Sequence, residues 1–290
     1  MNIKINDKPL DFSLDNEKTI GDVFAALELW LTNSGHRMSK FSIDGKNISV
    51  SMVEEVFSQG INTVKNLDIY TDTVADLTAS SLEALLDDIK NFDSLGFNEK
   101  TAFYNIWKES AQAKFINEQW NDLYILCGNV FSGGSVSSDV LHTITGERLR
   151  EVNKPVQEFK NLESLMNDTC SRLVDLPLDI QTGKDKRAAE TIQIFSSISE
   201  KIFRIYRQLD NQKLLTRADE TREVSSDVSA EKSILKLIND FGAVAKELLQ
   251  AYERQDIVLV GDLTEYEMAP LLQNLYNAIA ENIHDTAGGE

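Results

Sequence analysis

The chain has 290 residues, of which 42% are hydrophobic and 26% charged, values that are typical of a folded protein and argue against a disordered one. Its formal net charge is −18, and the sequence shows no cluster of Lys and Arg, which argues against nucleic acid and anionic membrane surfaces as partners. The length predicts about two domains.

The start of the chain shows no export signal. Charged and apolar residues alternate from Met1 to Lys8, and the apolar core of a signal peptide is missing. No apolar run approaches the length of a membrane span. The two cysteines, Cys127 and Cys170, fall in apolar helical contexts without CxxC spacing, which favours two buried free thiols. We therefore expect a cytoplasmic protein.

Residues 1–71 predict a small domain of strands and helices. Apolar residues alternate with polar ones on both sides of a turn at 6–9, which indicates a hairpin. Thr19 and Asp22 form a capping box that starts a helix with one apolar face. The predicted apolar positions are Ile3, Ile5, Leu10, Phe12 and Leu14 in the hairpin, Ile20, Val23, Phe24, Leu27 and Leu31 in the helix, Phe41, Ile43, Ile48 and Val50 in two further strands around the Asp44-Gly45 turn, Val53, Val56 and Phe57 in a helical turn, and Leu67 and Ile69 in the last strand.

This order of elements resembles ubiquitin. The segment Phe41-Ser42-Ile43-Asp44-Gly45-Lys46 is similar to its third strand and turn, and Asn66-Leu67-Asp68-Ile69-Tyr70 is similar to its last strand. The resemblance implies a ubiquitin-like β-grasp fold for residues 1–71. Ubiquitin's free diglycine tail is missing after the last strand, so conjugation is not expected. The positions that match ubiquitin's partner-binding patch are Ser42 and Tyr70, and we expect a more polar partner site there.

Residues 78–284 predict an all-α helical bundle. A polar linker is expected at 73–80, followed by a helix that starts at a capping box of Ser80 and Glu83. Two more helical segments precede the Ser132-Gly133-Gly134-Ser135 break.

Three features mark the second half of this bundle. Pro155 should kink a helix or mark its break, and Pro270 should interrupt the last helix. Residues 217–232 are polar and predict a loop. A bundle seam is the clearest pattern, and it consists of Ala188, Ile192, Phe195, Ser199, Ile202, Tyr206 and Leu209.

Three polar residues are candidates for ligand or metal binding. Asp262 and Glu265 lie three residues apart and would share a helix face, where two carboxylates can bind a hard cation or act as acid and base. A solvated acidic face is the favoured interpretation. Lys184 lies in Gln181-Thr182-Gly183-Lys184-Asp185, which lacks the upstream Gly and the hydroxyl of a phosphate loop. A helix start is favoured there, with anion binding at Gly183 as the alternative.

Parts of the helical region resemble uncharacterised helical proteins of bacteria. The similar segments are 176–185, 256–259 and 262–270. The resemblance implies a bacterial origin and brings no activity with it.

These observations favour a non-enzymatic cytoplasmic adaptor or scaffold. It would dock protein partners through the ubiquitin-like domain, at Ser42 and Tyr70, and through the bundle, whose exposed face could also form a homodimer. No catalytic residue, metal or cofactor is predicted. The alternative is an enzyme or ligand-binding protein that uses Asp262 and Glu265, together with Lys184, in a pocket between helices.

Overall fold

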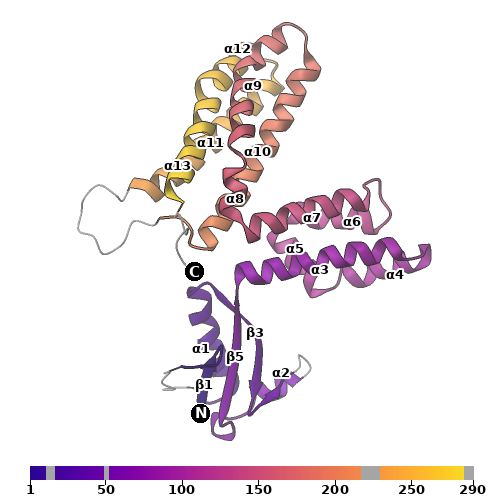
Figure 1. The fold of residues 1–290 in the computed structure, drawn as a ribbon, viewed down its shortest axis with the longest axis vertical. Helices are drawn as coiled ribbons and strands as arrows, with labels where there is room; N and C mark the ends of the chain where they lie inside the picture. The colour runs from indigo at the N-terminus through magenta and orange to yellow at the C-terminus, as the bar shows by residue number, and fades with distance from the viewer. Residues whose placement is uncertain (11–16, 49–51, 217–228, 284–290) are drawn as a thin grey trace. The chain divides into compact units, whose positions relative to one another are not determined.

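The computed structural model describes residues 1–10, 17–48, 52–216 and 229–283 and shows the α+β architecture that the sequence predicts (Figure 1). A five-stranded mixed sheet comes first and helices follow. The contacts divide the chain into two compact units, Met1–Gly146 and Glu147–Glu290. The predictions made for Phe12, Leu14 and Val50, and for most of the 217–232 loop, lie outside the described residues. Within the described ranges, no helix has the length and apolar character needed to cross a membrane.

The sheet has the order β2-β1-β5-β3-β4. Its central pair, β1 and β5, is parallel, with Ile3 opposite Leu67, and the other neighbours are antiparallel. The predicted hairpin and the Asp44-Gly45 turn are confirmed, and both turn residues have the positive φ that a tight hairpin turn requires. The strands are β1 (Asn2–Ile5), β2 (Lys8–Leu10), β3 (His36–Ile43), β4 (Lys46–Asn47) and β5 (Asn66–Thr73).

Helix α1 (Ile20–Asn33) provides the other half of the sheet's core. The predicted capping box is confirmed: the Thr19 hydroxyl accepts from the N–H of Asp22 at 3.2 Å, and the Asp22 carboxylate accepts from the N–H of Thr19 at 2.9 Å. These hydrogen bonds lower the pKa of Asp22. All five predicted apolar positions of α1 are buried. The short helices α2 (Val53–Phe57) and η2 (Ile61–Thr63) precede β5.

The predicted linker at 73–80 is wrong, because helix α3 (Val74–Ser94) begins directly after β5. The Thr73 hydroxyl accepts from the N–H of Asp76 at 3.0 Å, and the Asp76 carboxylate accepts from the N–H of Thr73 at 3.2 Å, which caps the helix here. The predicted capping box of Ser80 and Glu83 is therefore wrong as well, since both residues lie inside α3. The predicted domain boundaries at 71 and 78 stay a prediction.

Helices α4 (Phe97–Trp107), α5 (Ala111–Gln119) and α6 (Asn121–Phe131) complete the first unit. Helix α7 (Ser138–Asn153) begins in the first unit and ends in the second. The predicted break after residue 131 is confirmed. The ring of Phe131 contacts those of Phe92, Phe103 and Trp107, with centroids 4.9–5.2 Å apart. Cys127 is free and buried, and desolvation raises its pKa to about 12.

The second unit is a helical bundle. Pro155 begins α8 at the break after α7, which confirms that predicted interruption. The predicted interruption at Pro270 is wrong, because Pro270 lies in the first turn of α13, where α12, η3 and α13 follow one another without a gap. Residues 229–232, which the predicted loop included, belong to α11. Helix α9 packs against α10 and α13, and α13 packs against α11. The helices are α8 (Pro155–Lys160), α9 (Glu163–Gln181), α10 (Asp185–Asn211), α11 (Ser229–Glu253), α12 (Ile257–Asp262), the π-helix η3 (Leu263–Met268) and α13 (Ala269–Asn282).

Candidate functional site

An apolar groove lies between α10 and α11 of the second unit. One face of each helix lines it, together with residues of α9 and α12, and it encloses about 310 Å³. This volume falls at the lower end of the range for ligand-binding clefts. The lining residues are Leu173, Leu176, Ile192, Phe195, Ser196, Ser199, Glu200, Phe203, Phe241, Ala245, Leu248, Leu249, Tyr252 and Val260.

The groove exists because α10 and α11 meet through long side chains. The ring of Phe241 lies 5.8 Å from that of Phe195 and 5.4 Å from that of Phe203, measured between centroids. These aromatic contacts join the two helices through side chains, whereas α9 with α10 and α11 with α13 approach each other more closely along their backbones. The predicted seam of α10 is therefore only partly a core seam. Ile192 and Phe195 are half-buried and line the groove.

The surface of the groove is apolar and continues beyond its mouth. Leu249 is 58% exposed and Tyr252 is 47% exposed, and Tyr252 also borders a second hollow that Ile257 of α12 lines. The Ser199 hydroxyl is satisfied internally, because it donates to the carbonyl of Phe195 at 2.7 Å. An occupant would therefore meet mainly hydrocarbon, which is the surface that apolar side chains of a partner bury favourably.

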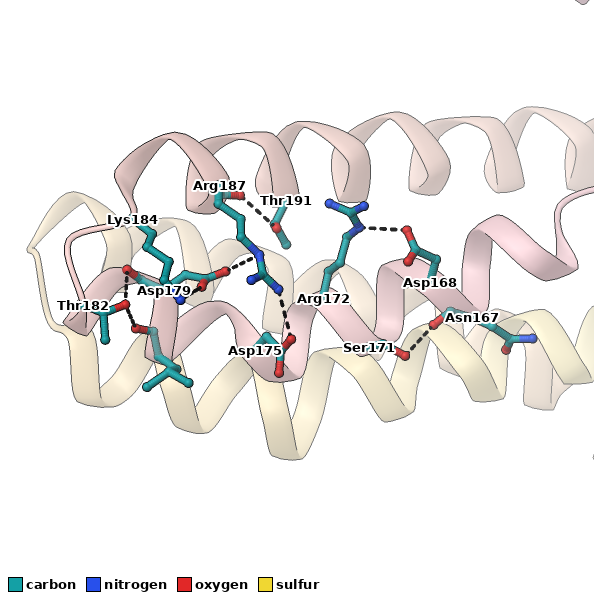
Figure 2. Close-up of polar contacts among 11 residues, drawn as sticks. Asn167, Asp168, Ser171, Arg172, Asp175, Asp179, Thr182, Lys184, Arg187 and Thr191 are labelled. Carbon is teal, nitrogen blue, oxygen red and sulfur yellow. Dashed lines mark hydrogen bonds and ion pairs between the residues drawn. The ribbon is translucent and has the colours of Figure 1, made fainter.

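A polar cluster fixes the turn between α9 and α10 (Figure 2). The Asp179 side chain is only 3% exposed, and its carboxylate lies 2.9 Å from Nε of Arg187 and 3.4 Å from Nζ of Lys184. Arg187 also donates to Asp175 at 3.1 Å. The predicted ligand residue Lys184 thus takes part in an ion pair at the start of α10. The sequence-based alternative of an anion bound at Gly183 stays a prediction.

Asp262 and Glu265 lie at the end of α12 and in the π-helix η3, and both are exposed. A hydrogen bond to Glu265, and then the negative charges of Glu265 and Asp262, raise the pKa of Tyr266. Neither carboxylate lines the surface recess to which Lys184 belongs. Among the residues that the structure describes, no group of three or more His, Cys, Asp or Glu side chains could hold a metal ion.

The π-helical turn η3 contains a buried hydroxyl, that of Thr264. The Thr264 side chain donates to the carbonyl of Val260 at 2.8 Å and lies 3.1 Å from that of Gly261. Thr145 in α7 and Thr169 in α9 donate to the carbonyl four residues earlier in the same way, so these bonds satisfy a buried hydroxyl and are not specific to a π-helical turn. The turn presents Glu265, Tyr266 and Glu267 to solvent.

Ser42 and Tyr70 lie on neighbouring strands, β3 and β5, on the sheet face opposite the apolar core. The strand register places Ser42 opposite Asp68 and Lys40 opposite Tyr70. Ser42 is 8% exposed, and the Tyr70 hydroxyl donates to Asp7 at 3.2 Å, which raises the pKa of Tyr70. This face is polar, as the sequence predicts, and its role in partner binding stays a prediction.

A buried ion cluster that the sequence did not predict lies between α7 and α10. Glu151, with a side chain 3% exposed, accepts two hydrogen bonds of 3.0 Å from Arg204, and Nη1 of Arg148 lies 3.6 Å from the same carboxylate. Desolvation raises the pKa of Glu151 to about 7, while Arg148 and then Lys201 act in the opposite direction. The cluster fixes the end of α7 onto the bundle.

Comparison with known proteins gives two family matches and one relative. Residues 1–73 match the TP0873 N-terminal domain, and residues 157–278 match a domain of unknown function, DUF8042. No solved structure matches. An uncharacterized protein of Treponema pallidum (strain Nichols) is 20% identical over 279 residues, which are 96% of each chain. The chain is thus similar to an uncharacterized bacterial protein over nearly its whole length, and every residue that lines the groove lies within the DUF8042 match.

Proposed function

We propose that this protein is a non-enzymatic adaptor that binds a helix of a partner protein in the groove between α10 and α11. The groove itself is the observation that supports the proposal. Its two walls are faces of long helices, and an amphipathic helix laid between two such faces buries its apolar side as a further member of the bundle. From Phe241 to Tyr252 the α11 wall measures about 17 Å, enough for about three turns of a bound helix.

The N-terminal domain would serve as a second docking module with a ubiquitin-like β-grasp fold. The strand order, the parallel pair β1 and β5, and the placement of α1 after the first hairpin support this proposal. Ser42 and Tyr70 would belong to its contact face. A cytoplasmic location is part of the same proposal.

The alternative of an enzyme or ligand-binding protein has less support. Asp262, at the end of α12, and Glu265, in η3, are both exposed, and Lys184 forms an ion pair with Asp179. Reacting groups normally converge on a concave site, and these three residues line no common hollow among those described.

Site-specific photocrosslinking tests the adaptor proposal. Leu249 in the groove and Leu165 on α9 are each replaced with p-benzoylphenylalanine in the full chain and irradiated in the cells that produce the protein. Both native side chains are about half-exposed, at 58% and 45%, so Leu165 is a matched control outside the groove. We expect a discrete protein adduct from position 249 and none from 165.

A second variant shows whether the adduct reports on the groove. Ala245→Trp fills the space between the walls, and its fold is checked by circular dichroism. The adduct from position 249 should disappear in this variant. Identical adducts from both positions, or an adduct that survives Ala245→Trp, would refute helix binding in the groove.

A further inference from the structure

We propose that the helix bound in the groove is basic and places a Lys or Arg beside its apolar face, where it pairs with Glu200. This inference rests on the proposed adaptor function and names the chemistry of the partner. It follows from the charge at the wall of the groove, from the shape of that wall, and from the charge of the chain.

Among the residues that the structure describes, Glu200 is the one charged side chain that lines the groove. It is exposed and accepts a hydrogen bond of 3.4 Å from the Ser196 hydroxyl. Within the described part of the chain it forms no ion pair, in contrast to the buried carboxylates of Glu151 and Asp179, which both contact cations. Lys246 and Arg207 belong to the same two helices, but neither lines the groove.

The wall near Glu200 would allow a helix to approach closely. Ser196 and Ser199 on α10 and Ala245 on α11 have small side chains, whereas the other residues of the two walls are larger. Small residues at a helix interface shorten the distance between helix axes, so that a cation at the edge of a bound helix can reach a carboxylate on the wall.

The charge of the chain favours the same partner. The net charge of −18 attracts a basic segment at long range and repels an acidic one. An amphiphile with a carboxylate head would bring like charge to Glu200 at the mouth of the groove. A basic amphipathic helix satisfies both the apolar walls and the carboxylate.

Binding of synthetic helices to the full chain tests the inference. Three fluorescein-labelled peptides of about 14 residues, four turns long, share one Leu face and carry Lys, Gln or Glu on the other. Fluorescence anisotropy gives the Kd of each. We expect the Lys peptide to bind at least about tenfold more tightly than the Gln peptide, and the Glu peptide to bind most weakly.

Two charge-reversal variants separate the groove from general acidity. Glu200→Lys should weaken the Lys peptide by about tenfold and strengthen the Glu peptide. Glu247→Lys makes the same change in net charge at an exposed position of α11 outside the groove, so it should leave the preference unchanged. Ala245→Trp should weaken all three peptides.

The possible results distinguish the two proposals. Equal binding of the Lys and Gln peptides, or equal effects of the two Glu→Lys variants, overturns the basic partner and leaves helix binding intact. No binding of any peptide, together with no crosslink from position 249, overturns the adaptor function itself. A dimer in sedimentation that Ala245→Trp dissociates places a second copy in the groove and also overturns the basic partner.

Discussion

Replacing Arg204 with Met should destabilise the second unit by about 3 kcal/mol near pH 8, because the substitution leaves Glu151 as a buried carboxylate without its main partner. The loss comprises two hydrogen bonds of 3.0 Å to a side chain that is 3% exposed. Breaking a buried ion pair typically costs about 3–5 kcal/mol, and the nearby cations Arg148 and Lys201 place the expected value at the lower end. Methionine keeps much of the apolar stem of arginine, so the change is mainly one of charge.

The deficit should depend on pH in a definite direction. Burial already raises the pKa of Glu151 to about 7, above its ordinary value of 4.5, and the loss of Arg204 raises it further. A carboxyl group whose pKa is higher in the folded state lowers stability as the pH rises from its unfolded pKa through its folded one. The deficit should therefore be largest near pH 8 and shrink near pH 5, where protonation removes the buried charge.

Urea unfolding followed by far-UV circular dichroism measures the effect. All three tryptophans, Trp30, Trp107 and Trp120, lie in the first unit, so their fluorescence should report a transition that the substitution leaves in place. Arg172→Met is the matched control. Its pair with Asp168, at 2.7 Å, joins side chains that are 35% and 53% exposed, and its loss should cost less than about 1 kcal/mol. Equal deficits in the two variants, or a deficit that grows toward pH 5, would contradict the reasoning.

Two further predictions concern the π-helix and its neighbour on α9. Thr264→Val should lower the free energy of unfolding by about 1–2 kcal/mol, because it removes a buried hydroxyl from two carbonyls. A circular dichroism midpoint equal to that of the unchanged chain would show that these hydrogen bonds do not stabilise the fold. Gly261→Ala should cost up to about 2 kcal/mol, because the new methyl group would lie 3.2 Å from two atoms of the Pro177 ring, and this crowding outweighs the gain of about 1 kcal/mol that alanine brings to a helix. Its control, Gly242→Ala on α11, meets open space and should stabilise by about 0.5–1 kcal/mol, so the two substitutions should shift the midpoint in opposite directions.

The sequence predicts the sheet region well, because short motifs there fix the backbone through hydrogen bonds or turn geometry within a few residues. The Thr19–Asp22 capping box and the Asp44-Gly45 turn are examples, and each specifies its own geometry. Thr73 and Asp76 form an equally good box, yet the start of α3 was predicted to be a linker. The first two turns of α3 bury only Thr78, so the apolar periodicity that normally indicates a helix is missing there.

The groove and the ion cluster could not be predicted in the same way. Ile192 and Phe195 follow the same spacing as the buried residues of α10, and only the distance to α11 makes them walls of a groove. Glu151 and Arg204 are 53 residues apart, and the sequence offers many other acidic and basic residues with which each could pair. Both features depend on which helices become neighbours, and side-chain periodicity does not determine that.

The direct passage from β5 into α3 has a consequence for motion in the first unit. Thr73 pairs with His36 at the end of the sheet ladder and also caps α3, so no residue between strand and helix is free to rotate. A hinge at this point would have to break either the last ladder pair or the cap. In hydrogen–deuterium exchange, amides from the end of β5 through the first hydrogen-bonded turns of α3 should therefore open together, as one cooperative segment.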